Sequence, residues 1–178
     1  SDSLGLDVDA DSTVTSLSVA NITPVSIASG SSLSGGITVT AGSIKLAETG
    51  TLASSVSMSG GTLDADNSLT VSGALSQSGN ITIDVADNKT LTYSGTAISL
   101  GANTLTLIGG GTLSNTNALV LNDADSLLSL AGILVMGDVD GTTASNSSKG
   151  IRVTSSATLG DYDLSAVSYL YLAANQTL

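Results

Sequence analysis

Aspartates separated by a single residue are the feature of this sequence with the most chemical potential. Fourteen of its 15 acidic residues are aspartate, and eleven of these lie two positions from another: Asp7, Asp9, Asp11, Asp64, Asp66, Asp123, Asp125, Asp138, Asp140, Asp161 and Asp163. On an extended segment, residues i and i+2 point the same way, so two carboxylates can converge on one hard cation. Ca²⁺ takes about six to eight oxygen ligands. We therefore expect calcium at such pairs, with 7–11 and 138–141 as the best candidates.

A second explanation of the same pattern needs no metal. Aspartate caps its own backbone in tight turns, whereas glutamate is too long to do so. The bias of 14 aspartates to one glutamate, Glu48, is therefore also typical of a chain with many corners.

Composition excludes several other chemistries. The 178 residues include no His and no Cys, so the chain offers no imidazole base, thiolate, zinc site or disulfide. Four basic residues and a net charge of −11 exclude nucleic acid as a partner. None of Lys45, Lys89, Lys149 and Arg152 is expected beside an acidic pair in the repeat, as the base of a polysaccharide lyase would be. We predict no catalytic residues and no enzyme.

Short apolar–hydroxyl–apolar triplets must provide the elements that position these residues. They alternate with period two between Gly, Asn, Asp and Ser clusters, which is typical of strands followed by turns. The middle residues predict an outward column of hydroxyl groups: Ser18, Ser26, Thr38, Ser57, Thr70, Thr82, Thr92, Ser99 and Thr106. Such a column is how solenoid ice-binding proteins order water, although Thr is also simply a good polar strand former.

The spacing of the apolar residues indicates stacked coils. One series recurs at a constant interval of about 22 residues: Leu69, Leu91, Leu113 and Val135. A second series recurs at about 14 residues: Leu91, Leu105, Leu119 and Ile133. We predict one all-β domain over 1–178, a β-solenoid (parallel β-helix) with coils of about 22 residues. The scarcity of aromatic residues is consistent with a narrow interior that has little room for rings. An antiparallel β-sandwich is the alternative.

The phrases GGTLDADNSLTVSGAL (60–75) and LTLIGGGTLSNTNALVL (105–121) resemble the passenger regions of bacterial autotransporters and filamentous-haemagglutinin-like adhesins. The likeness covers residues 37–136. It implies a secreted right-handed parallel β-helix that serves as a surface stalk, an adhesin or a matrix component, and it carries no active site over to this chain.

Three segments depart from the simple repeat. In the segment 119–136 outward positions become apolar, at Val120, Leu128 and Leu134, and the segment 167–172 has Tyr on one face and Leu on the other. We expect these two segments either to pack on each other or to form a subunit interface. Residues 137–150 are predicted to be a long polar loop. The recurring phrase starts again at 173–178, which predicts an open coil edge completed by further coils or by a neighbouring copy.

Together these features predict a non-enzymatic, extracellular structural protein that self-assembles into a microbial surface fibre, layer or adhesin stalk. Its partners would be other copies of itself and a surface polysaccharide. No run of apolar residues is long enough to span a membrane as a helix. A host- or surface-binding adhesin domain is the alternative function, and an ice-binding protein is a third.

Overall fold

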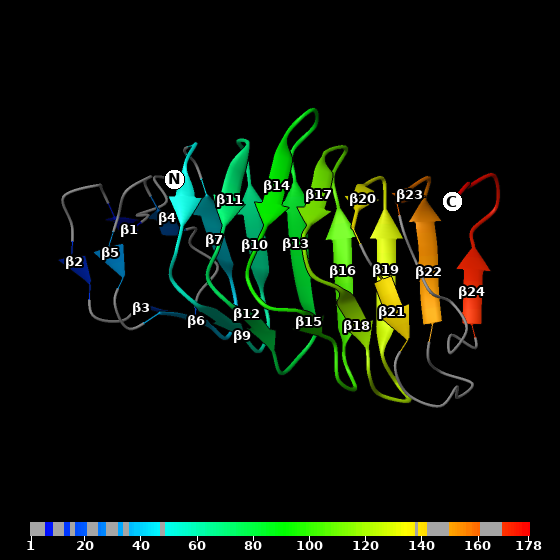
Figure 1. The fold of residues 1–178 in the computed structure, drawn as a ribbon, viewed down its shortest axis with the longest axis horizontal. Helices are drawn as coiled ribbons and strands as arrows, with labels where there is room; N and C mark the ends of the chain where they lie inside the picture. The colour runs from blue at the N-terminus through cyan, green and yellow to red at the C-terminus, as the bar shows by residue number, and fades with distance from the viewer. Residues whose placement is uncertain are drawn as a thin grey trace.

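The computed structural model describes residues 6–8, 13–14, 17–20, 25–27, 32–33, 36–46, 49–137, 139–141, 150–160 and 169–178. In this part of the chain every element is a β-strand and every strand pair is parallel. The chain is an all-β solenoid, as the sequence predicts. The antiparallel sandwich is excluded, because its strands would pair with alternating direction. Figure 1 shows the strands stacked along the long axis of the molecule.

Each coil places one strand on each of three faces. The first face is a nine-stranded sheet of β1 (Leu6–Val8), β4 (Val25–Ile27), β7 (Ser43–Leu46), β10 (Thr62–Ala65), β13 (Ile81–Val85), β16 (Thr104–Ile108), β19 (Leu127–Ala131), β22 (Gly150–Ser155) and β24 (Tyr169–Leu172). The second face carries a two-stranded sheet of β2 (Thr13–Val14) and β5 (Ser32–Leu33), followed by a six-stranded sheet of β8 (Thr51–Leu52), β11 (Leu69–Val71), β14 (Thr90–Tyr93), β17 (Thr112–Asn115), β20 (Leu134–Met136) and β23 (Thr158–Leu159).

The third face has a break in the middle. Its first sheet consists of β3 (Leu17–Val19), β6 (Ile37–Val39), β9 (Val56–Met58) and β12 (Leu75–Gln77), and its second of β15 (Ile98–Ser99), β18 (Leu119–Leu121) and β21 (Val139–Gly141). The Gln77 amide bridges the break, because its Nε2 donates to the carbonyl oxygen of Leu100 at 3.1 Å. The strands β12 and β15 therefore lie next to each other without a shared ladder.

The longer of the two predicted spacings is the true coil repeat in the middle of the second face, whereas the steps from Leu52 to Val71 and from Val135 to Leu159 differ from it. Leu69 pairs with Leu91, Leu91 with Leu113, and Leu113 with Val135. On the first face the coil length varies, because the step from Leu6 to its partner Val25 is shorter than the step from Ile81 to its partner Leu105. The shorter predicted spacing is not a coil. It is roughly two thirds of one, so successive members lie on different faces.

Inward residues form straight columns of aliphatic side chains through the stack. One column on the first face runs through Ile44, Leu63, Ile83, Leu107, Leu130 and Val153, all fully buried. Alternation with period two supplies this column, because every second residue of a strand points inward. The continuous core is therefore built from up to three aliphatic residues per strand, as in β13 with Ile81, Ile83 and Val85.

A ring does fit inside the coil, contrary to the expectation from composition. Tyr93 is only 2% exposed, and its hydroxyl accepts a hydrogen bond from the backbone N–H of Leu75 at 2.9 Å. Space for the phenol comes from Gly95, where a Cβ would lie 2.6 Å from the Tyr93 hydroxyl oxygen. A small residue at the corner thus compensates for a large one in the strand.

The two apolar segments do not pack on each other. The strand β22 lies between β19 and β24 in the same sheet, so the prediction of mutual packing is wrong for the described residues. Leu128 faces the core, where it pairs with Leu105 and Ile151, and its neighbour Leu127 is the partly exposed residue. The outward residue of β19 is thus Leu127, one position before the predicted Leu128.

The predicted polar loop at 137–150 also contains ordered strand. Val139 is fully buried in β21, and β22 begins at Gly150. Residues 142–149 lie outside the described part of the chain.

Candidate functional site

The Asp64–Asp66 pair lies on the outward surface of the first face, and its carboxylates converge as the sequence predicts. Asp64 is opposite Lys45 in one neighbouring strand and opposite Asp84 in the other. The Lys45 ammonium forms an ion pair with the Asp66 carboxylate. The expectation that no basic residue adjoins an acidic pair is therefore wrong, because the short coil between β7 and β10 places Lys45 opposite Asp64.

The electrostatics of this cluster show the cost of stacking like charges. Burial, and then the negative charge of Asp66, raise the pKa of Asp64, although Lys45 opposes the shift. Burial followed by the charge of Asp66 also raises the pKa of Asp84. The hydrogen bond to Asp66 is the main reason that the pKa of Lys45 is raised. The Lys45 ammonium thus interacts with two of the three carboxylates, those of Asp66 and Asp64.

The Asp123–Asp125 pair forms a turn. The Asp123 carboxylate accepts a hydrogen bond from the backbone N–H of Asp125 at 3.0 Å, and the Asp123 N–H donates to the Ser126 hydroxyl at 2.9 Å. That hydroxyl donates in turn to the carbonyl oxygen of Gly101, one coil earlier, at 2.7 Å. At this pair the aspartate therefore caps a turn, as the explanation without a metal ion predicts.

Calcium binding stays a prediction for the remaining pairs. The described residues contain no group of three or more acidic side chains arranged to hold a metal. Asp7 lies in β1 and Asp140 in β21, where the structure describes only the backbone, and Asp9, Asp11, Asp138, Asp161 and Asp163 lie outside the described residues. At Asp64 and Asp66 the cation in contact is the Lys45 ammonium.

The hydroxyl residues form several columns, not one. The second face carries Thr51, Thr70, Thr92 and Ser114 in register, a column that ends at the half-exposed Met136. The third face carries Ser18, Thr38, Ser57 and Ser76. Ser26, Thr82 and Thr106 belong to the first face. The predicted single column is wrong, because consecutive triplets turn a corner and occupy successive faces.

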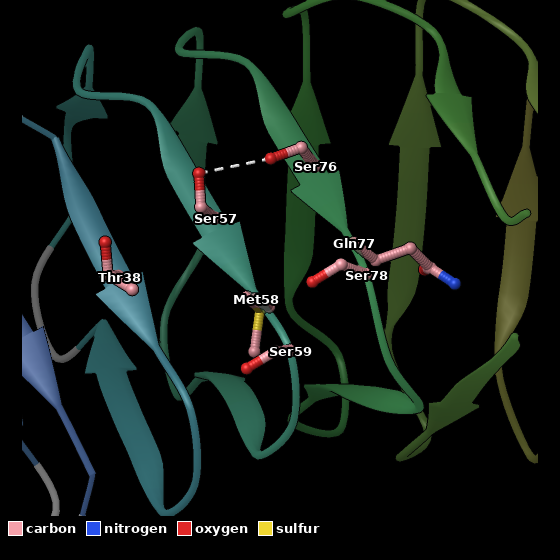
Figure 2. Close-up of a pocket in the computed structure, with 7 residues that line it drawn as sticks. All are labelled: Thr38, Ser57, Met58, Ser59, Ser76, Gln77 and Ser78. Carbon is pink, nitrogen blue, oxygen red and sulfur yellow. Dashed lines mark hydrogen bonds between the residues drawn. The ribbon is translucent and has the colours of Figure 1, made fainter.

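A shallow depression of about 300 Å³ lies on the third face. It is lined by Thr38, Ser57, Met58, Ser59, Ser76, Gln77 and Ser78. Figure 2 shows the Ser57 and Ser76 hydroxyl groups side by side on neighbouring strands, joined by a hydrogen bond of 3.2 Å. The lining offers hydroxyl and amide groups to a polar ligand and contains no carboxylate or amine.

A second depression, of about 260 Å³, lies at the corner between the first and second faces. Its lining residues are glycines, aliphatic residues and hydroxyls: Gly110, Gly111, Thr112, Gly132, Ile133, Leu134, Ser156, Ala157, Thr158 and Thr177. The acidic cluster of the first face thus lines neither depression, and the two depressions contain no ionisable group.

Sequence reasoning missed the amides and hydroxyls that join one coil to the next. The Asn80 side chain accepts from the Thr104 N–H at 2.9 Å, and the Asn122 side chain accepts from the Gly101 N–H at 2.8 Å. The Ser68 hydroxyl accepts from the Thr90 N–H at 3.1 Å. The available signal was the recurrence of Asn or Ser directly beside a strand, before it at Ser68 and Asn80 and after it at Asn122. It identifies structural residues, because these bonds satisfy backbone groups at corners.

In the part of the chain that the structure describes, no helical segment has the length and apolarity needed to cross a bilayer. The protein-family models, curated proteins and solved structures compared with this chain include no match to it.

Proposed function

We propose that this chain is a non-enzymatic, extracellular structural protein whose copies stack into a fibre, layer or stalk at a microbial surface. The observation that carries the proposal is the exposed end of the core. Leu170 and Leu172 are 48% and 41% exposed, although their register partners Ile151 and Val153 are fully buried. A parallel edge with apolar inward residues is a template for another strand.

The use of the polar side chains supports a structural role. Asn, Ser and Asp side chains in the described corners satisfy backbone groups of the same or the adjacent coil. The ionisable cluster Lys45, Asp64, Asp66 and Asp84 lies on a sheet surface, outside both depressions. The corner side chains hold adjacent coils together, which is what a load-carrying stack requires.

The composition supports an extracellular location. A chain without Cys is indifferent to the redox state of its surroundings. Only four Lys and Arg residues leave few cleavage sites for proteases that act after basic residues. Calcium ions that bridge acidic corners, and a polysaccharide of the surface as a second partner, are parts of the same proposal.

The test is assembly of the purified chain, followed by light scattering and electron microscopy. We expect fibres of uniform width, and we expect Leu172→Asp to abolish them, because a carboxylate at an inward position cannot be covered by another coil. Thr38→Asp is the matched control, since it adds the same charge on the exposed third face and should leave assembly intact. A monodisperse monomer at high protein concentration, with or without calcium, would overturn the proposal.

An adhesin domain is the second candidate function, and the depression on the third face favours it. The five hydroxyl side chains there can form hydrogen bonds with a neutral polysaccharide, whereas the Gln77 amide is directed towards Leu100. Tight binding of such a polymer by a monomer that never assembles would favour this alternative.

Ice binding has less support. The hydroxyl groups of an ice-binding protein should lie on one flat face, whereas those of this chain are spread over three faces. Thermal hysteresis in a solution of the purified chain would favour ice binding instead.

A further inference from the structure

The contact between β12 and β15 on the third face is a seam, because these neighbouring strands share no ladder. On the first and second faces the same two coils are joined by the ladders of β10 with β13 and of β11 with β14. The coil contacts directly before and after the seam have ladders on all three faces. At the seam, backbone ladders therefore hold the solenoid together on two faces instead of three.

Coil length changes at the seam on every face. On the third face the step from Val56 to its partner Leu75 is shorter than the step from Ile98 to its partner Leu119. On the first face β7 and β10 are closer in sequence than β13 and β16, and on the second face β8 and β11 are closer than β11 and β14. Two coils of different length have different outlines, so their backbones do not superpose on all three faces at once.

The strands on the two sides of the seam belong to different blocks of the stack. The N–H groups of Ile98 and Leu100 donate to the carbonyl oxygens of Ala118 and Val120 in the following coil, each at 3.0 Å. The strand β12 pairs instead with β9 of the preceding coil. The third face therefore consists of two separately paired sheets that meet at the seam.

A tyrosine hydroxyl replaces a backbone acceptor at the seam. Before the seam, the Val56 N–H donates to the carbonyl oxygen of Ala74 in the next coil at 2.8 Å. The equivalent N–H one coil later is that of Leu75, and it donates to the Tyr93 hydroxyl at 2.9 Å. Tyr93 lies in β14 on the second face, so a side chain that crosses the interior supplies the bond that a ladder would otherwise make.

The second link across the seam is the Gln77 amide. Its Nε2 donates to the Leu100 carbonyl oxygen at 3.1 Å, and Figure 2 shows the side chain directed away from Ser57 of the preceding strand. Its Oε1 is buried and has no hydrogen-bond partner within the described part of the chain. The amide thus holds the seam through one of its two polar ends.

We infer that the third face opens at this seam while the ladders of the first and second faces stay paired, so that the solenoid bends there as at a hinge. Tyr93 and Gln77 are the latch that keeps the seam closed. Opening breaks two side-chain hydrogen bonds and no ladder, and segments held by few bonds open at the lowest free-energy cost. The inference concerns a single copy and does not depend on the proposed self-assembly.

Because the chain contains no cysteine, one introduced thiol can report the opening. Ile98→Cys places it at the seam, and Val56→Cys and Leu119→Cys are matched controls in β9 and β18 of the same face. All three side chains are fully buried, and each control strand has a ladder on both sides. In native buffer we expect iodoacetamide to modify Ile98→Cys several-fold faster than either control, as measured by mass spectrometry.

The latch is tested by a second substitution in the same background. Tyr93→Phe removes the acceptor of the Leu75 N–H, and Gln77→Leu removes the bond to Leu100. Each should accelerate modification of Ile98→Cys several-fold more than that of Val56→Cys. Ser57→Ala removes an exposed hydrogen bond between paired strands and should leave the rates unchanged. Circular dichroism of each variant confirms that its β-sheet is retained.

Two results would overturn the inference. One is equal modification rates at the three thiol positions, which would show that the seam opens no more often than a laddered contact. The other is equal acceleration of all three by Tyr93→Phe, which would show that this residue acts through the stability of the whole fold. Amide hydrogen exchange of the unaltered chain is an independent measurement, in which the Leu75 N–H should exchange several-fold faster than the Val56 N–H; equal protection would contradict the seam. Fibre formation bears on none of these rates, so the proposed function is tested separately.

Discussion

Tyr93 shows how much a single residue can decide inside a narrow solenoid. Its ring occupies the interior at the corner near Gly95, and its hydroxyl satisfies a buried backbone N–H of the preceding coil. Composition argued against rings in the core, because it treated the interior as uniform. The missing side chain of Gly95 leaves the space that the Tyr93 hydroxyl occupies.

Replacing Tyr93 with Phe should therefore destabilise the fold by about 1–3 kcal/mol, since the Leu75 N–H would stay buried without an acceptor. Thermal or urea unfolding measures the change. Ser76→Ala also removes one hydroxyl, but from an exposed hydrogen bond, and should change stability by only about 0.5 kcal/mol. Equal effects of the two substitutions would show that the phenol hydroxyl contributes nothing special.

The aspartate pairs show what spacing alone could and could not predict at this scale. Residues i and i+2 of a strand point the same way, and this rule correctly places the Asp64 and Asp66 carboxylates together because it depends only on strand geometry. The cation that meets them is Lys45, which lies one coil before Asp64. Its position depends on the exact length of that coil, which an average repeat does not give.

At the scale of strands, register determines which charges face one another. The strands β7, β10 and β13 place Lys45, Asp64 and Asp84 in one outward row. Like charges directly opposite in neighbouring strands destabilise a sheet. In the folded chain the pKa of Asp84 is raised, first by burial and then by the Asp66 charge, so the folded state holds this proton more tightly than the unfolded state does.

It follows that ionised Asp84 lowers stability, and that this cost disappears as the pH falls below its raised pKa towards the ordinary carboxyl value. We expect Asp84→Asn to raise the melting temperature at pH 7 and to reduce the gain in stability on mild acidification. Unfolding curves between pH 7 and pH 4 test this, with Asp87→Asn as an exposed control of equal charge. A melting temperature that Asp84→Asn lowers equally at every pH would contradict the argument.

At the scale of the whole molecule, the solenoid is a translational stack with a net charge of −11. Stacking copies end to end brings like net charges together, so counterions must lower the repulsion. Divalent cations lower the repulsion between copies more effectively per ion than monovalent cations do. Aspartate oxygens are ligands that calcium accepts.

We therefore expect millimolar calcium to raise both the melting temperature and the extent of fibre formation beyond the effect of sodium chloride at equal ionic strength. A calcium titration followed by thermal unfolding and light scattering measures this. No shift at millimolar calcium would remove calcium from the proposed function, and self-assembly would then depend on the apolar end alone.

The class of fold, the mean coil length and the second-face ladder of Leu69, Leu91, Leu113 and Val135 could all be predicted from the amino-acid pattern. These follow from local alternation and constant spacing, which depend only on the geometry of strands. Which residues share a face, which strand borders which, and where the core is left open became clear from the folded chain alone. Coil length changes along the first face, from the short step between β1 and β4 to the long step between β13 and β16. Each change in coil length shifts which residues of later coils lie opposite one another. An average period therefore could not predict the neighbours of Lys45, the inward direction of Leu128 or the exposure of Leu172.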